Sequence, residues 1–178
     1  MIHTNIPALC AVFGMLVACA EPNMDTTVQT TETAPSEGIV VLLKSVEGNY
    51  ISCELGLEGA DRAMLVANRT TPGDWERFTM YTKPDGRISL KAANGKYLCA
   101  DDYRGDTLVA DRDTPGDWES FTLEPQEGGS VLLKTHEGRY VAADLDLEGN
   151  YHGRLVGDRA QAGDWERFTI VPATIQLP

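Results

Sequence analysis

A four-residue segment, Gly-Asp-Trp-Glu, occurs three times in this chain and contains all three of its tryptophans, Trp75, Trp118 and Trp165. The copies are 43 and 47 residues apart, and each is followed, after one residue, by a phenylalanine. A repeat of this length indicates similar structural units that pack against one another. It therefore constrains the fold more strongly than any other feature of the sequence.

Each repeat can be read as four short strands separated by turns. In the first repeat we expect strands at 41–44, 50–53, 64–67 and 76–80, the last one starting directly after the tryptophan. The other two repeats carry equivalent segments. A glycine-containing turn separates the first two strands, as is typical of a hairpin. No segment keeps a 3.6-residue period, so the domain should contain almost no helix.

The alternation of apolar and polar residues predicts which side chains face the core. Cys53 and Cys99 lie in equivalent strands but one position out of register, so they should face opposite ways and form no disulfide. The residues of the first repeat that should point inward are Val41, Leu43, Ile51, Cys53, Leu65, Ala67, Phe78 and Met80.

Three four-stranded units leave two architectures to consider. A propeller needs about four to eight blades. Three units that close on themselves instead predict a small barrel capped by hairpins, without open sheet edges.

The segments 95–101 (Gly-Lys-Tyr-Leu-Cys-Ala-Asp) and 138–144 (Gly-Arg-Tyr-Val-Ala-Ala-Asp), each followed by Gly-Asp-Trp-Glu, resemble the fascin-like branch of the β-trefoils. The resemblance implies one all-β domain, a β-trefoil at 39–178. Actin bundling is not expected, because it needs at least two binding surfaces and acidic filaments would repel an acidic domain. The expected repeats are 40–86, 87–129 and 130–172.

The N-terminal segment is expected to direct the chain to the cell envelope. Residues 1–18 contain no Asp, Glu, Lys or Arg, and their apolar stretch suits a signal peptide better than a membrane span. Leu16-Val17-Ala18-Cys19 resembles a bacterial lipobox, which implies that Cys19 becomes a lipidated N-terminus. A plain signal peptide or a misassigned start codon is the alternative.

Residues 19–38 are rich in Thr, Glu and Pro and have little to bury, so we expect a disordered tether. The expected location is a lipid-anchored position in a bacterial envelope, at the outer membrane in a Gram-negative host.

The charge of the chain excludes one class of partner. The net charge is −12, and all 15 Lys and Arg residues lie after residue 38. Nucleic-acid binding needs clustered basic residues, so an acidic chain argues against it. Like-charge repulsion favours a soluble monomer.

Catalysis has little support in the sequence. His136 and His152 are the only histidines after the signal segment, and neither lies in a nucleophile or metal-ligand motif. Asp144, Asp146 and Glu148 resemble the start of a calcium loop, but the closing glutamate is missing. We therefore expect no enzyme activity, no cofactor and no metal site.

Residues present in all three repeats are interpreted as parts of the scaffold. Each tryptophan should seal the barrel, with a sugar-stacking platform as the alternative. Each motif glutamate should pair with the arginine that ends strand three, because a carboxylate facing the core is costly unless paired. If these pairs are partly buried, Glu119→Ala should cost about 3 kcal/mol, because it leaves a buried cation unpaired. The expected pairs are Arg69 with Glu76, Arg112 with Glu119 and Arg159 with Glu166.

Loops that break the threefold symmetry are candidates for binding, since function concentrates in loops on a rigid scaffold. The β-trefoil resemblance implies a shallow glycan site with a carboxylate beside an aromatic ring. We therefore expect a surface-anchored carbohydrate-binding module; the alternative is a protein-interaction or structural lipoprotein without a small ligand. The partner would be a glycan or a cell-surface protein. The candidate ligand residues are Asp101, Asp102 and Tyr103 in repeat two, and Asp144, Asp146, Tyr151 and His152 in repeat three.

Overall fold

Twelve short strands and four one-turn 3₁₀ helices make up residues 37–173, the part of the chain that the computed structural model describes. Repeat one holds β1 (Ile39–Lys44), β2 (Tyr50–Glu54), η1 (Gly59–Asp61), β3 (Met64–Arg69) and β4 (Phe78–Thr82). Repeat two holds β5 (Ile88–Lys91), β6 (Tyr97–Asp101), η2 (Asp102–Arg104), β7 (Thr107–Arg112), β8 (Thr122–Pro125) and η3 (Glu127–Gly129). Repeat three holds β9 (Val131–Lys134), β10 (Tyr140–Asp144), η4 (Gly149–Tyr151), β11 (Arg154–Arg159) and β12 (Arg167–Pro172).

The low helix content expected from the sequence is confirmed for these residues. None of the helices among them is long and apolar enough to cross a membrane. The expected signal peptide, the lipidation site Cys19 and nearly all of the expected tether lie outside the described residues.

Six strands form a closed barrel. β1 pairs with β4 and β12, β4 with β5, β8 with β9, and β9 with β12, all antiparallel. β5 and β8 meet at one bridge, Ile88 with Phe121, where each backbone N–H donates to the other residue's carbonyl at 2.8 Å. This bridge completes the circuit, so the barrel has no open edge.

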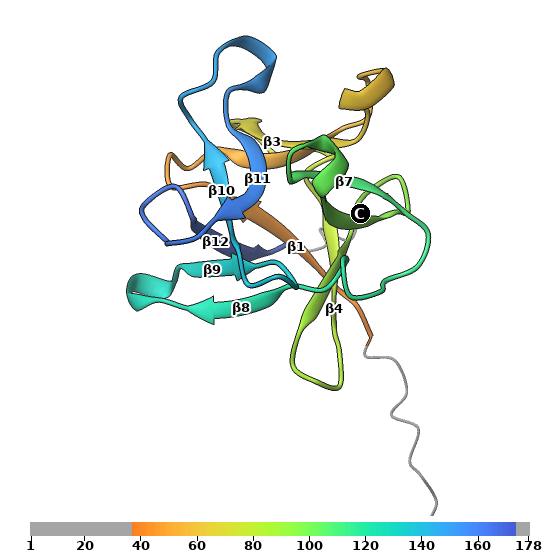
Figure 1. Cartoon of the computed structure of the whole chain (residues 1–178), viewed down its shortest axis with the longest axis vertical. Coiled ribbons are helices and arrows are strands. Elements are labelled where there is room, and N and C mark those ends of the chain that lie inside the picture. The colour runs from red at the N-terminus through yellow and green to blue at the C-terminus, as the bar shows by residue number, and fades with distance from the viewer. Residues whose placement is uncertain (1–36, 174–178) are drawn as a thin grey trace, which may run out of the picture. The chain divides into compact units, whose positions relative to one another are not determined.

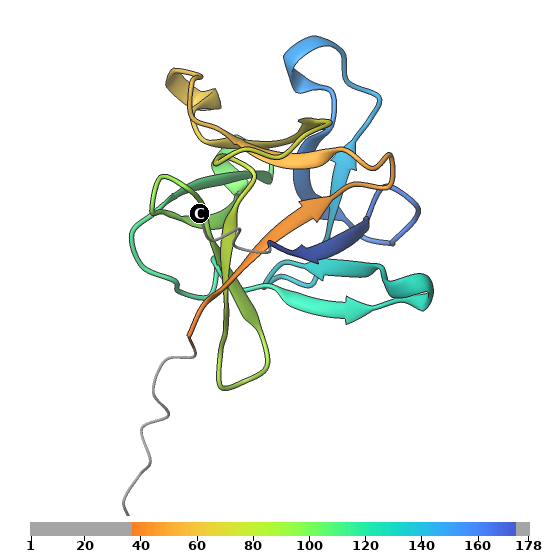
Figure 2. The ribbon, with the colours of Figure 1, turned by 180° about the vertical axis from the view of Figure 1, so that it is seen from behind.

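Three hairpins, β2–β3, β6–β7 and β10–β11, cap the barrel, and Figures 1 and 2 show them on one side of the barrel strands. Their second strands pair with one another in a triangle. A barrel capped by a triangle of hairpins is the β-trefoil arrangement that the repeats predict. Three backbone hydrogen bonds of 2.8–2.9 Å connect the corners of this triangle. The donor N–H groups and acceptor carbonyls are Ala67 to Gly153, Ala110 to Ala63 and Gly157 to Asp106.

The core follows the period-two alternation of the sequence. All eight residues predicted to point inward in repeat one contribute to it, with Met80 only partly buried against the central cluster. Cys53 lies in this cluster, whereas the Cys99 Sγ is 3.7 Å from the Asp111 carboxylate, and both thiols are free. The prediction of no disulfide is therefore confirmed. Burial raises the pKa of each thiol to about 12.

The expected start of the fourth strand was wrong. Asp74, Asp117 and Asp164 accept a hydrogen bond at their backbone carbonyls from the residue three positions later, so Gly-Asp-Trp-Glu forms a turn. The strands begin only at Phe78, Thr122 and Arg167. Short-range turn hydrogen bonds satisfy the backbone there, which a reading based on alternation alone could not reveal.

Asp106 has a positive φ of 57°, and its equivalent in repeat three is a glycine, Gly153. An L-residue pays a steric cost in this region, so Asp106→Gly should stabilise the fold by about 0.5 kcal/mol. Burial, and then the nearby Asp158 and Glu137, raise the Asp106 pKa. A raised folded-state pKa means that stability falls as pH rises through that pKa, so the gain should be larger at pH 7 than at pH 3.

Urea denaturation of the Asp106→Gly variant at the two pH values checks this expectation. Asp106→Asn is the matched control, because it removes the charge and keeps the side chain in the left-handed region. A glycine variant less stable than the parent at pH 7 would show that the backbone is not strained there.

Candidate functional site

An arginine at the end of the third strand lies between two carboxylates in every repeat. In repeat two, Arg112 Nε is 3.7 Å from Glu119 Oε1 and its Nη2 is 3.6 Å from Asp101 Oδ2. The other two predicted pairs, Arg69–Glu76 and Arg159–Glu166, are also present, at 3.8 and 3.9 Å. The sequence interpretation missed the second carboxylate, which ends strand two in each repeat: Glu54, Asp101 and Asp144.

The motif glutamates make a shorter contact than the one to arginine. In each motif the glycine N–H donates to the glutamate Oε2, at 2.5 Å in repeats one and three and 2.7 Å in repeat two. The glutamates are buried, with 4–6% of their surface exposed. Each carboxylate therefore closes its own turn, which explains the spacing of glycine and glutamate in the motif.

None of the three tryptophans is buried to the extent that sealing the barrel requires, and Trp165 is half-buried. Trp75 and Trp118 keep 37% and 40% of their surface exposed. The Trp75 and Trp165 backbone carbonyls do anchor the scaffold, since they accept hydrogen bonds from Cys53 and Ala143 at 3.0 and 2.9 Å. The turn geometry uses the backbone and leaves these rings partly available at the surface.

A cavity of about 240 Å³ lies beside Trp118 in repeat two. Asp102 and Tyr103 from η2 line it, together with Arg112 and the buried Glu119. Tyr103 is 94% exposed, and the His136 ring lies against Trp118 with the ring centroids 4.0 Å apart. Two of the three residues predicted for this repeat therefore lie at a cavity, and the sequence interpretation had not placed Trp118 with them.

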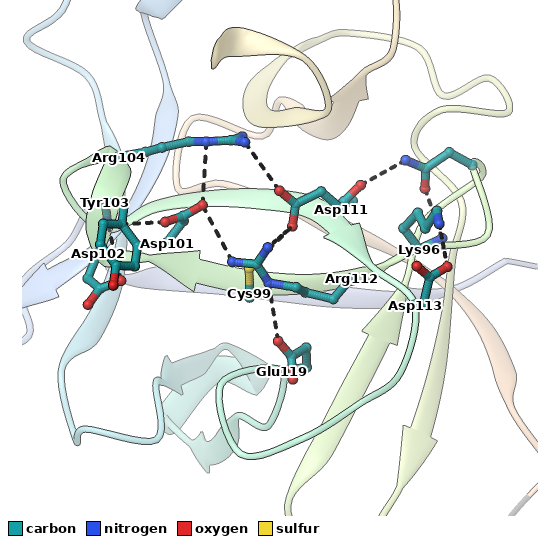
Figure 3. Close-up of polar contacts among 12 residues, drawn as sticks. Lys96, Cys99, Asp101, Asp102, Tyr103, Arg104, Asp111, Arg112, Asp113 and Glu119 are labelled. Atoms are coloured by element: carbon teal, nitrogen blue, oxygen red, sulfur yellow. Dashed lines mark hydrogen bonds and ion pairs between the residues drawn. The ribbon is translucent and has the colours of Figure 1, made fainter. Parts of the chain in front are cut away.

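Asp101, the third predicted residue, is buried and stabilises η2. Only 5% of its surface is exposed, and its Oδ1 accepts a hydrogen bond from the Tyr103 N–H at 3.1 Å. Its Oδ2 is 3.4 Å from Arg104 Nε (Figure 3). These contacts hold η2 in place and leave Asp102 and Tyr103 exposed.

The candidate residues of repeat three engage separate partners. The Asp144 carboxylate is 3.4 Å from Arg159 Nη2, and Asp146 is exposed. The Tyr151 hydroxyl donates to Asp61 at 2.8 Å, and this hydrogen bond raises the Tyr151 pKa. His152 Nε2 is 3.7 Å from a carboxylate oxygen of Glu47. Tyr151 and His152 thus connect repeat three to repeat one. Within residues 37–173, no group of three or more His, Cys, Asp or Glu side chains could hold a metal ion.

Solved structures with this fold include a designed threefold-symmetric protein, ThreeFoil, with 18% identity and a TM-score of 0.65, covering 75% of this chain and 99% of that one. The Rhizoctonia solani agglutinin has 13% identity and a TM-score of 0.62, covering 76% and 96%. An exo-β-1,3-galactanase from Clostridium thermocellum has 13% identity and a TM-score of 0.64, covering 76% and 30%.

The chain spans well under half the length of several larger neighbours. At these identities the likeness shows the β-trefoil fold alone. No curated protein matches the chain significantly. One family model, described as a domain of unknown function (DUF7910), matches residues 36–162. Since this match spans well over half of the sequence, the chain belongs to the DUF7910 family.

Proposed function

We propose that this domain is a non-catalytic carbohydrate-binding module and that its binding site is the cavity beside Trp118. One observation carries the proposal: a half-exposed tryptophan and an almost fully exposed tyrosine lie at a cavity that also holds a carboxylate and a guanidinium. An aromatic ring packs against the apolar face of a sugar, while charged side chains bond its hydroxyls. Small-molecule sites combine these two kinds of surface.

The non-catalytic part of the proposal rests on the lining of this cavity. Glycoside hydrolysis uses a pair of carboxylates. Of the two carboxylates here, Glu119 is buried and bonded to the Gly116 N–H, which leaves Asp102 as the exposed one. An agglutinin and a galactanase share the fold, which supports a sugar ligand by analogy only.

The proposal places the module at a bacterial envelope, held there by acyl chains on Cys19, and assigns it to the fascin-like branch of the β-trefoils. These finer points rest on the sequence motifs, since Cys19 lies outside the described residues.

The decisive experiment screens the purified full-length chain on a glycan array and on insoluble polysaccharides, followed by calorimetric titration of the best ligand. Trp118→Ala and Tyr103→Ala should each weaken binding about tenfold or more, because each removes a stacking surface. Trp75→Ala is the matched control: this tryptophan is equally exposed, but the cavity beside it is lined by no tyrosine.

Circular dichroism spectra of all the variants should match that of the parent. Binding that survives Trp118→Ala unchanged would contradict the proposed site. If no glycan or polysaccharide binds at all, the alternative, a protein-interaction or structural lipoprotein, becomes the better hypothesis.

A further inference from the structure

The three junctions between neighbouring repeats are equivalent positions in a threefold fold, so differences among them point to individual roles. At the junction of repeats three and one, His152 follows η4 and its Nε2 lies 3.7 Å from Glu47. At the junction of repeats one and two, Arg62 follows η1 and so takes the place of His152. Asn94 takes the place of Glu47, since each precedes a positive-φ glycine in the hairpin turn.

The exchange of Glu47 for Asn94 leaves Arg62 without an acidic partner. The Asn94 side chain is already engaged, donating to the Ala110 carbonyl at 2.8 Å and accepting from the Lys96 N–H at 3.0 Å. Arg62 is exposed and makes no ion pair with any residue in the described range 37–173. A guanidinium with five donors therefore lies at this junction without a carboxylate as its ion-pair partner.

This junction is hollow. A cavity of about 300 Å³ lies between the two repeats, lined by three cationic side chains, Arg62, Lys96 and Arg104, and by a single carboxylate, Asp111. Such a concentration of positive charge contrasts with a chain whose net charge is −12. It also contrasts with the junction of repeats two and three, where Asp158 and Glu137 lie close enough to Asp106 to raise its pKa.

The charge of Asp111 is already matched within the protein. Its Oδ2 is 3.3 Å from Arg104 Nη2, and its Oδ1 is 3.2 Å from Arg112 Nη1, a residue outside the cavity lining (Figure 3). Lys96 forms a surface ion pair with Asp113, a kind of contact that contributes little free energy. Arg104 Nη1 is buried and has no hydrogen-bond partner among the described residues. Arg104 also faces Asp101 at 3.4 Å, so Arg62 is the cation of this cavity that no carboxylate of the described residues offsets.

We propose that the cavity between repeats one and two binds the carboxylate of an acidic sugar, a uronic acid residue of a polysaccharide. An arginine guanidinium pairs with a carboxylate in a bidentate geometry, and Arg62 is available for it. The same wall offers Asp111 as an acceptor for sugar hydroxyls. The volume is at the lower end of small-molecule sites, which suits one sugar ring. This inference rests on the proposed function in one respect only, namely that the ligand is a sugar.

The test compares an oligogalacturonate with its neutral methyl ester by calorimetric titration of the purified full-length chain. The acid should bind about tenfold or more tightly than the ester, and its affinity should fall as salt is added, because ions screen the attraction. Arg62→Ala should remove most of this preference. Arg77→Ala is the matched control, an exposed arginine of the same repeat that makes no ion pair with the described residues.

Asn94→Glu is the sharper variant, because it installs at this junction the residue that faces His152 at the next one. It should give Arg62 an internal partner and abolish the preference for the acid. Equal affinities for acid and ester, or an Asn94→Glu variant that binds the acid like the parent, would overturn the inference.

Trp118→Ala separates the two proposed sites. Binding that depends on Trp118 but not on Arg62 or on the ligand's charge supports only the cavity beside Trp118. Binding that depends on Arg62 but not on Trp118 supports only the cavity between repeats one and two.

Discussion

Replacing Phe121 with alanine should lower the free energy of unfolding by about 3–5 kcal/mol, the usual cost of deleting a fully buried aromatic ring. Its exposed fraction is 1%, and it belongs to the same core cluster as Phe78 and Phe168. The structure adds a reason why Phe121 matters beyond its volume. Its backbone forms the single bridge to Ile88 through which β8 meets β5 and the barrel closes.

Urea denaturation of Phe121→Ala, followed by tryptophan fluorescence, measures this loss. Val46→Ala is the control, because Val46 is apolar but 48% exposed and should change stability by less than about 0.5 kcal/mol. Amide hydrogen exchange gives a second readout. The Ile88 and Phe121 amides should exchange faster in the variant than the amides that join β1 and β12. A loss below about 1 kcal/mol would mean that the barrel closes without this ring.

The fold could be predicted from the sequence because buried positions in the strands are occupied by apolar residues. In strands such as β1 the alternate residues Val41 and Leu43 both lie in the core cluster, as alternation predicts. The count of three repeats then excluded a propeller and left the closed barrel. Both inferences depend only on the pattern of apolar residues and on the number of repeats, and both can be read directly from the sequence.

The roles of the repeated residues were harder to predict, because they depend on backbone hydrogen bonds. Glu76, Glu119 and Glu166 were assigned to arginine alone, whereas each also accepts a bond from its own motif glycine. Exposure of the tryptophan rings follows from the same turns. Residue type indicates that a carboxylate needs a donor, but the turn geometry decides which donor reaches it.

The candidate site was predicted in part. Asp102 and Tyr103 were proposed as a carboxylate beside an aromatic ring, and they do lie at a cavity. Asp101 and Asp144 were grouped with the ligand residues, although an acid ends strand two in all three repeats and pairs with an arginine there. That Arg62 and Asn94 line the same cavity could not be predicted, since it depends on how neighbouring repeats pack.

Glu119→Ala should lower the free energy of unfolding by about 2 kcal/mol, less than the 3 kcal/mol that an unpaired buried cation would cost. No buried cation is left unpaired, because Arg112 is 44% exposed and keeps Asp101 and Asp111 at 3.6 and 3.2 Å. What the variant loses is the charge-assisted bond from the Gly116 N–H at 2.7 Å. That N–H would be left in the turn without its acceptor.

Glu119→Gln separates the two contributions. Its amide oxygen can still accept from Gly116, while its charge is gone, so the loss should be about half that of alanine, since charge-assisted bonds are roughly twice as strong as neutral ones. Glu127→Ala, at an exposed acid of η3, is the matched control and should be nearly neutral. Chemical denaturation of the three variants provides the comparison. If glutamine is as costly as alanine, the ion pair with Arg112 is the contact that matters, and the motif's glycine is needed only for the shape of the turn.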